Sequence, residues 1–306
     1  MRLAWNGASL RVPGDWEPAR LGKSYLFLED GTGPVLECKW TAAKKQLSPD
    51  AAVKRLARES GARIEPIEEN ALRPAWKKAL ADADHAAFAW KSPHMEGLGA
   101  VFRPDGGGPL TVLRFYRPLR PEKDAGEPFT SHAPIWDEVL GSYRRHDGEE
   151  RAPFELYGIR LLAPQGRALK TFSFKPGAFE IEFEGGRESL TYARFAPAEA
   201  ILRGKTLEGW TRAAFSLGNN DSALPLASPP DHADNPAMLF ASPGPGNPLY
   251  RGLLRAACAV SGRKRFTGGI VRHYLKHNRI LCLTARGTRP ISPERLAALE
   301  KDYGTF

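Results

Sequence analysis

The amino-acid sequence predicts an α+β fold made of two similar domains, each an antiparallel sheet packed with helices in α/β/α layers. One observation is a short sequence motif that occurs twice. Gly7 and Pro13 of the first copy match Gly158 and Pro164 of the second at a constant offset of 151 residues. The other is that strands, a helix, further strands and a closing helix follow each copy in the same order. A chain of 306 residues is long enough for two such cores. We expect domains at residues 1–148 and 152–306.

The first repeat begins with a strand in which Leu10 and Val12 alternate with polar residues. The two strands that follow are joined by a turn with the sequence Asp30-Gly31, which is typical of hairpins. Ser48 as N-cap, with a proline after it, predicts a helix that ends at Gly61. The expected strands span residues 8–12, 24–29, 35–40, 85–90, 99–103 and 110–116. The expected helices span 49–60 and 134–144, and residues 62–84 have no regular pattern.

The second repeat follows the same order, and its last helix opens with Ser292-Pro293, as the first helix of repeat one opens with Ser and Pro. The main difference is the stretch 224–248, where seven prolines in 25 residues predict an extended surface loop without regular structure. The expected strands span residues 157–162, 170–174, 178–183, 188–195, 255–260, 268–275 and 280–285. A helix is expected from about 199 or 206 to 217.

The opening strand of the first repeat runs into Pro13, Gly14 and Trp16, and a hairpin, a helix, further strands and a closing helix follow. This arrangement resembles the PsbP/Mog1-like family, and the resemblance covers both halves as a tandem duplication. In the second repeat Arg167 takes the place of Trp16. Members of that family include photosystem accessory subunits and binders of small GTPases, which share no chemistry. The resemblance therefore implies a fold and carries over no functional residue.

The composition, with 42% hydrophobic and 26% charged residues, is typical of a soluble globular protein. No stretch approaches the roughly 20 apolar residues of a membrane helix, and the first residues do not form a signal-peptide core, so no membrane partner is expected. The three cysteines, Cys38, Cys258 and Cys282, lie in apolar runs without metal-binding spacing. We expect them to be buried thiols in a reducing compartment, and we expect a cytoplasmic protein.

No catalytic, cofactor or metal site is predicted. The run Arg203–Thr206 ends like a phosphate-binding loop, but Glu199 stands where that loop needs a glycine. His273 and His277 have a spacing that would suit a metal on a helix, whereas the repeat predicts a hairpin there. On a strand the two residues would lie about 13 Å apart, too far to share an ion. No serine nucleophile motif is present.

The strongest functional pattern is basic. Residues 1–150 hold 22 Lys and Arg and 22 Asp and Glu, so the whole net charge of +9 falls in the second repeat. No acidic residue occurs between Asp234 and Glu294. Two hairpin ends are expected to present cations and aromatic rings at one edge of the second sheet, a surface suited to phosphates and stacked bases. The candidate residues are Arg263, Lys264, Arg265, Phe266, Arg272, His273, Lys276, His277 and Arg279.

Two functions from different classes follow. The first is a non-enzymatic binding or accessory protein that docks a protein partner, with Trp5, Trp16, Trp76 and Trp90 as candidate anchors. The second is binding of nucleic acid or another polyanion through the basic edge. An enzyme that acts on a phosphorylated or acidic small molecule is a third alternative, which no motif supports.

Overall fold

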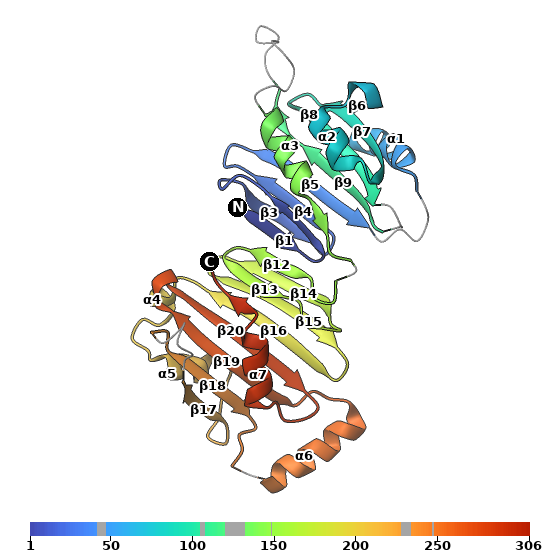
Figure 1. Cartoon of the computed structure of the whole chain (residues 1–306). Helices are drawn as coiled ribbons and strands as arrows, with labels where there is room; N and C mark the ends of the chain where they lie inside the picture. Colours follow the sequence, from blue (N-terminus) through green and yellow to red (C-terminus); the bar gives the residue numbers. More distant parts are fainter. Residues whose placement is uncertain (42–46, 105–107, 120–131, 148, 228–233, 247) are drawn as a thin grey trace. The chain divides into compact units, whose positions relative to one another are not determined.

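The computed structural model describes residues 1–41, 47–104, 108–119, 132–147, 149–227, 234–246 and 248–306. The chain forms two compact units, Met1–Glu149 (unit 1) and Glu150–Phe306 (unit 2). Figure 1 shows that antiparallel strands dominate the mixed α+β fold. The predicted α+β class with antiparallel sheets is confirmed.

Unit 1 begins with a tight hairpin of β1 (Arg2–Trp5) and β2 (Ala8–Arg11). Its two turn residues, Asn6 and Gly7, have φ values of 39° and 89°. Positive φ at both central positions is the geometry of the type I′ turn, which Asn-Gly adopts most readily. The short strand β11 (Arg144–Arg145) pairs with β2 on its outer side.

The main sheet of unit 1 has the strand order β3-β4-β5-β9-β8-β7-β6, and neighbouring strands in this order are antiparallel. The strands are β3 (Glu17–Gly22), β4 (Tyr25–Glu29), β5 (Pro34–Thr41), β6 (Arg63–Ile67), β7 (Ala83–Lys91), β8 (Met95–Pro104) and β9 (Leu110–Phe115). A two-residue strand, β10 (Arg117–Pro118), pairs with β8. The sheet was predicted in part, because β3 and β6 carry few buried residues and show no clear alternation.

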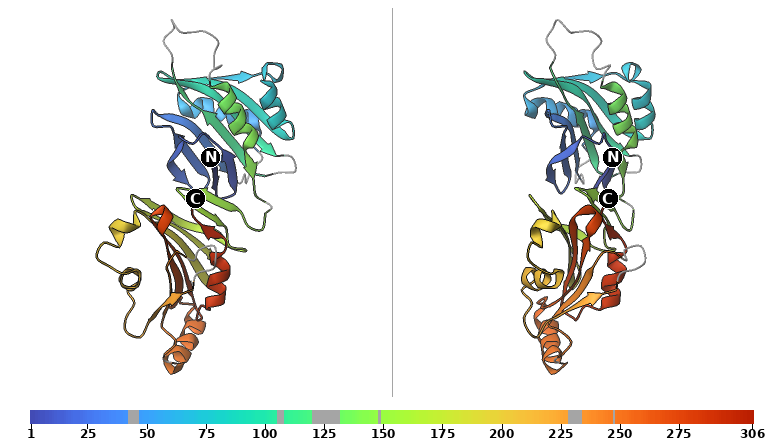
Figure 2. Two further views of the ribbon diagram at one scale, coloured as in Figure 1. Left: turned by 60° about the vertical axis from the view of Figure 1, so that its left-hand side comes forward. Right: turned by 90° about the vertical axis from the view of Figure 1, so that its left-hand side faces the viewer.

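Helices pack on both faces of this sheet (Figure 2). Helix α1 (Pro49–Ser60) begins at Ser48, whose side chain accepts a hydrogen bond from the amide of Ala51, as predicted. It buries Ala52 and Val53 in a cluster on one face. Helices α2 (Pro74–Leu80) and α3 (Ala133–Ser142) place Trp76 and Trp136 against Phe115, on the other face. A 3₁₀ turn, η1 (Glu69–Ala71), precedes α2.

Unit 2 opens with the same kind of hairpin, β12 (Pro153–Leu156) and β13 (Ile159–Leu162). Its turn residues Tyr157 and Gly158 have φ values of 50° and 72°. The short strand β21 (Tyr303–Gly304) pairs with β13, as β11 pairs with β2 in unit 1.

The main sheet of unit 2 has the order β14-β15-β16-β20-β19-β18-β17. The strands are β14 (Ala168–Lys175), β15 (Ala178–Gly185), β16 (Glu188–Phe195), β17 (Ser222–Leu226), β18 (Ala237–Ser242), β19 (Phe266–Tyr274) and β20 (Arg279–Gly287). Helices α4 (Ala198–Ile201) and α5 (Leu207–Ala214) cover one face, where Trp210 packs into a cluster with Met238 and Phe240. Helix α7 (Pro293–Glu300) packs against β19, β20 and β21 and buries Leu296.

Two predictions about unit 2 are wrong. Residues 255–260 form part of helix α6 (Pro248–Ser261) instead of a strand, because Leu254 and Cys258, one helical turn apart, supply its buried side. The Pro-rich stretch 224–248 contains β18 and most of β17, since an antiparallel edge strand tolerates Pro225. Residues 228–233 and 247 of that stretch lie outside the described residues.

Candidate functional site

The predicted basic edge is divided in the structure by the length of β19. Arg263, Lys264 and Arg265 precede this strand, whereas Lys276 and His277 lie in the 3₁₀ turn η4 (Leu275–His277) that follows it. A strand of nine residues separates the two groups by about 30 Å. The prediction that all these residues share one edge is therefore wrong.

Two of the predicted surface residues, and the neighbouring Tyr274, are buried. Arg272 is 2% exposed, and its guanidinium binds the carboxylate of Glu300 on α7 at 2.8 Å and 3.1 Å. Phe266 packs in a small core with two residues of α6, and Tyr274 is also buried. The reason is that β19 lies between β18 and β20 and both of its faces are covered. None of these three side chains can serve a surface that binds nucleic acid.

The remaining predicted residues divide into structural and exposed ones. Arg279 donates to the carbonyl oxygens of Gly158 (3.1 Å) and Phe306 (2.9 Å), so it holds the opening hairpin. His273 is half-buried, and burial lowers the pKa of its imidazole. Within the described residues no group of three or more His, Cys, Asp or Glu could hold a metal ion. The exposed residues are Arg263, Arg265, Lys276 and His277.

The predicted tryptophan anchors are also core residues. Trp5, Trp16, Trp76 and Trp90 are all buried, so none of them offers a surface to a partner. The three cysteines are buried free thiols, as predicted. Burial raises the pKa of the Cys38 and Cys282 thiols, which makes both poor nucleophiles.

The exposed apolar surface lies on α6, where the sequence did not predict a helix. Leu249, Leu253 and Val260 are 82%, 74% and 92% exposed, and their spacing places them on one side of the helix. Leu254 and Cys258, on the opposite side, pack against Phe266. We call Leu249, Leu253 and Val260 the α6 stripe. Figure 1 shows α6 extending away from the sheet of unit 2, so this side of the helix faces outward.

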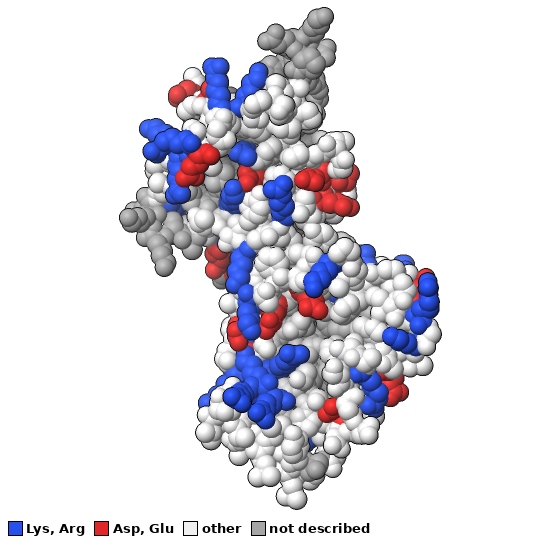
Figure 3. Space-filling model, turned by 180° about the vertical axis from the view of Figure 1, so that it is seen from behind, with Lys and Arg blue, Asp and Glu red and all other residues white. Residues whose placement is uncertain are grey.

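Cations lie at the C-terminal end of α6 and on the side of the helix away from the stripe. Arg255 is exposed on the helix, and the exposed Arg263 and Arg265 follow its last turn. No acidic residue occurs from 235 to 293 to balance them. Figure 3 shows Lys and Arg gathered over one part of unit 2. A helix with an apolar outer side and basic flanks is a typical docking element.

A second feature of unit 2 is a cleft of about 700 Å³ over β14, β15, β16 and β20. Thr191 and Thr284 are opposite each other on the floor. Glu180, Glu182 and Glu184 line one side. The rim includes Ala214, the last residue of α5, Phe215 directly after it, and residues of the segment between α6 and β19.

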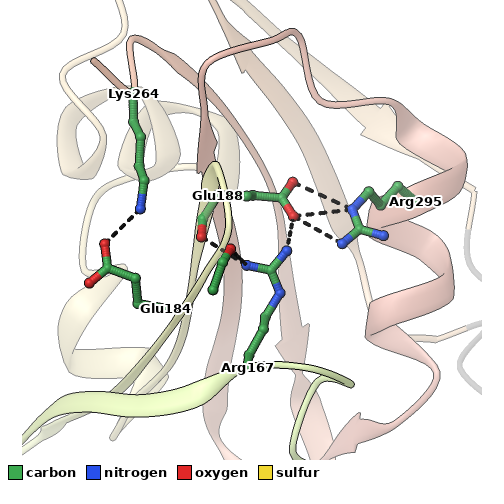
Figure 4. A network of polar contacts seen from close by, with 6 residues as sticks. Arg167, Glu184, Glu188, Lys264 and Arg295 are labelled. Atoms are coloured by element: carbon green, nitrogen blue, oxygen red, sulfur yellow. Dashed lines mark hydrogen bonds and ion pairs between the residues drawn. The ribbon is translucent and has the colours of Figure 1, made fainter. Parts of the chain in front are cut away.

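Ion pairs fix the charged end of this cleft. Figure 4 shows the ammonium of Lys264 directed at the carboxylate of Glu184, at 2.7 Å. This hydrogen bond holds the pKa of Glu184 below its ordinary value. Nearby, Glu188 binds both Arg167 and Arg295, and Arg167 also donates to the carbonyl oxygen of Gly185 (3.1 Å). The β15–β16 hairpin beside the cleft is thereby held in place.

Comparison with known proteins identifies no family. No family model matches the chain, and no curated protein matches it. A crystal structure from Bacteroides thetaiotaomicron is 12% identical with a TM-score of 0.28, and covers 52% of this chain. The match spans 50% of the length of that structure. A conserved protein of unknown function with a hot dog fold from Alicyclobacillus acidocaldarius is 9% identical, with a TM-score of 0.15. That match covers 87% of this chain and 96% of the other chain.

No helix in the described part of the chain has the length and apolar character needed to cross a bilayer.

Proposed function

We propose that the protein is a non-enzymatic binding or accessory protein whose α6 stripe docks onto a partner protein. The observation that carries this proposal is the exposure of three large aliphatic side chains on one side of a helix whose other side is already packed. Scattered apolar residues are normal on a surface, whereas a continuous row at helical spacing is typical of an interaction site.

The charges around α6 indicate the chemistry of the partner. Arg263 and Arg265 are exposed just after the Val260 end of the stripe and have no acidic neighbours in sequence from 235 to 293. A partner with an apolar centre and an acidic rim complements this surface. Two copies of the chain that met through α6 would bring like charges together, which disfavours a homodimer through this helix.

A photo-crosslinking amino acid at position 253, compared with one at the exposed Lys54 of α1, tests the proposal. We expect the first to capture a protein that the second does not. The purified partner should then bind at least tenfold more weakly to the Leu249→Ser/Leu253→Ser variant. Unchanged affinity contradicts the proposal. Light scattering and co-sedimentation with anionic vesicles test two other occupants. Dimerisation that the same substitutions abolish would assign α6 to a second copy of the chain. Vesicle binding that they abolish would assign it to a membrane.

Duplication is part of this proposal. The opening hairpins of the two units have the same lengths at an offset of 151 residues, and both main sheets have the same strand order. Helices on both faces of each sheet support the PsbP/Mog1-like layering. We also propose a cytoplasmic location, which three buried free thiols support.

Polyanion binding is a second candidate, now confined to the exposed cations near the end of α6. The gathering of Lys and Arg on unit 2 supports it. Fluorescence anisotropy with labelled RNA and DNA at two salt concentrations is the test. Arg263→Glu/Arg265→Glu should lower the affinity and reduce the salt slope by about 2. Lys276→Glu, at the far end of β19, is the matched control. Equal loss in both variants, or no binding by the wild type, removes this candidate.

A further inference from the structure

The cleft of unit 2 contains hydroxyl groups that the folded chain leaves without partners. Thr284 and Ser189 line the cleft, although they are only 6% and 7% exposed. Neither side chain makes a hydrogen bond to any described residue. Solvent reaches both hydroxyl oxygens through the cleft. Both are therefore free to form hydrogen bonds with a ligand that enters it.

The two ends of the cleft differ in chemistry. At one end Ala193 and Cys282 form the floor, and Phe195 and Phe215 stand beside them. This end is apolar. At the other end lies Arg286, four residues further along β20, which corresponds to about 13 Å. The hydroxyls of Thr191 and Thr284 lie between the two ends.

The unpaired charges lie at the two ends of the cleft. Lys264 pairs with Glu184 at 2.7 Å, and Lys170 pairs with Glu182 at 3.1 Å. Arg286 makes no ion pair within the described residues, and neither does Glu180, which lies beside Ala193 at the opposite end. A guanidinium at the end of an elongated cleft is suited to binding a carboxylate in a bidentate manner. Three glutamates along one side disfavour a ligand with two negative charges.

We propose that this cleft binds an elongated amphipathic monoanion, with its apolar part against Phe195 and Phe215 and its carboxylate on Arg286. The volume of about 700 Å³ lies in the range of small-molecule sites. The buried hydroxyls of Ser189 and Thr284 would contact the polar part of the ligand. This site is separate from the α6 stripe and does not depend on the function proposed for that helix.

Isothermal titration calorimetry of the full chain with sodium octanoate tests the site. We expect octanoate to bind, and octyltrimethylammonium and octyl phosphate to bind at least tenfold more weakly. Arg286→Gln should weaken octanoate binding at least tenfold. Arg289→Gln removes an exposed arginine outside the cleft and should change nothing. Thr191→Phe should abolish binding by filling the floor, with circular dichroism used to verify that each variant remains folded.

Three results would overturn the proposal. The first is the absence of octanoate binding by the wild type at millimolar concentration. The second is octanoate affinity that Arg286→Gln and Thr191→Phe both leave unchanged. The third is loss of octanoate binding in Leu253→Lys, since that substitution changes only the α6 stripe and would place the ligand there. Octyl phosphate binding as tightly as octanoate would contradict the preference for a single charge.

Discussion

Units 1 and 2 share a strand order, but part of a face that is filled in unit 1 is an open cleft in unit 2. The strand registers match the two sheets residue by residue. Gly99 of β8 lies beside Phe88 of β7, and Gly269 of β19 lies beside Phe240 of β18. A Cβ atom on Gly99 would lie 2.3 Å from a ring carbon of Phe88, and one on Gly269 would lie 2.6 Å from ring carbons of Phe240 and 2.5 Å from the carbonyl oxygen of Leu283. The aromatic ring occupies the space that a side chain would need.

From these glycines the two units diverge. Across the sheet from Gly99, unit 1 has Arg114 and then Glu37, whereas across from Gly269 unit 2 has Thr284 and then Thr191. In unit 1 the Arg114 guanidinium lies 4.9 Å from the centre of the Trp90 ring and 3.3 Å from the Glu37 carboxylate.

The small residues of unit 2 leave the floor of its cleft open. The same strand framework therefore accommodates two kinds of side chain. In unit 1 large side chains close this part of the face, whereas in unit 2 threonine hydroxyls line a cleft.

The largest expected effect is on the closed face of unit 1. Trp90→Ala should destabilise the protein by about 3–5 kcal/mol, because it removes a buried ring that packs against Tyr116 and donates to the carbonyl oxygen of Phe115. Ser242→Ala, at the matching position of unit 2, should change stability by less than about 0.5 kcal/mol. Urea unfolding followed by circular dichroism measures both. Equal effects would show that the face of unit 2 is packed like that of unit 1.

The glycines should be equally intolerant in both units. Gly99→Ala and Gly269→Ala should each cost about 1–3 kcal/mol, because the new methyl group overlaps a buried phenyl ring. Gly141→Ala in α3 and Gly252→Ala in α6 meet open space and should stabilise by about 0.5–1 kcal/mol. The midpoints of thermal unfolding compare all four variants. If Gly269→Ala left stability unchanged while Gly99→Ala lowered it, the two sheets would not be packed alike at these matched positions.

The charged network of unit 1 predicts a pH dependence. Burial opposes ionisation of Glu37, but the hydrogen bond from Lys39 and the charge of Arg114 outweigh it and hold the pKa of this carboxyl below its ordinary value. A lowered folded-state pKa contributes stability that is present above the unfolded pKa and is lost as pH falls through the folded pKa. Glu37→Gln should therefore cost about 1–3 kcal/mol at pH 7 and progressively less below about pH 4.

The pH dependence of unfolding of wild type and Glu37→Gln, recorded from pH 3 to 7, tests this expectation. Two curves that stay parallel over that range would show that the ionised form of Glu37 contributes nothing specific. Burial and the charge of Glu37 also raise the pKa of Tyr25 to about 12, so its phenol should remain protonated through this range.

The smallest expected effect concerns the hydroxyls. Thr284→Val should change stability by less than about 0.5 kcal/mol or increase it, since the hydroxyl has no partner among the described residues. Thr111→Val in unit 1 should cost about 1 kcal/mol, because that buried hydroxyl lies 3.1 Å from the Tyr143 hydroxyl. Chemical denaturation separates the two. Similar losses would mean that Thr284 already has its partner in the folded protein.

Local sequence signals predicted much of the fold. The N-caps Ser48 and Ser292 accept hydrogen bonds from the amides of Ala51 and Arg295, and the helices begin there. The prediction failed at α6, where short apolar runs suit a strand or a helix equally well. Leucines at 249 and 253 and a valine at 260 repeat at helical spacing, so this signal was present in the sequence.

The candidate sites depended on contacts that no local pattern contains. Arg272 pairs with Glu300, 28 residues away, and the pair is buried because α7 covers β19. Thr191 and Thr284 meet across strands that are 93 residues apart in sequence. A cluster of cations can be counted from a sequence. Whether each cation faces solvent depends on which strand is central.

The connection between β18 and β19 has a consequence for how this protein can diverge. In unit 1 three residues join Lys91 of β7 to Met95 of β8, whereas in unit 2 residues 243–265, including α6, join strands in which Ser242 and Thr267 are directly paired. This segment therefore leaves β18 and enters β19 at positions that lie side by side in the sheet. The length and the exposed side chains of this segment can therefore change without altering the pairing of β18 with β19.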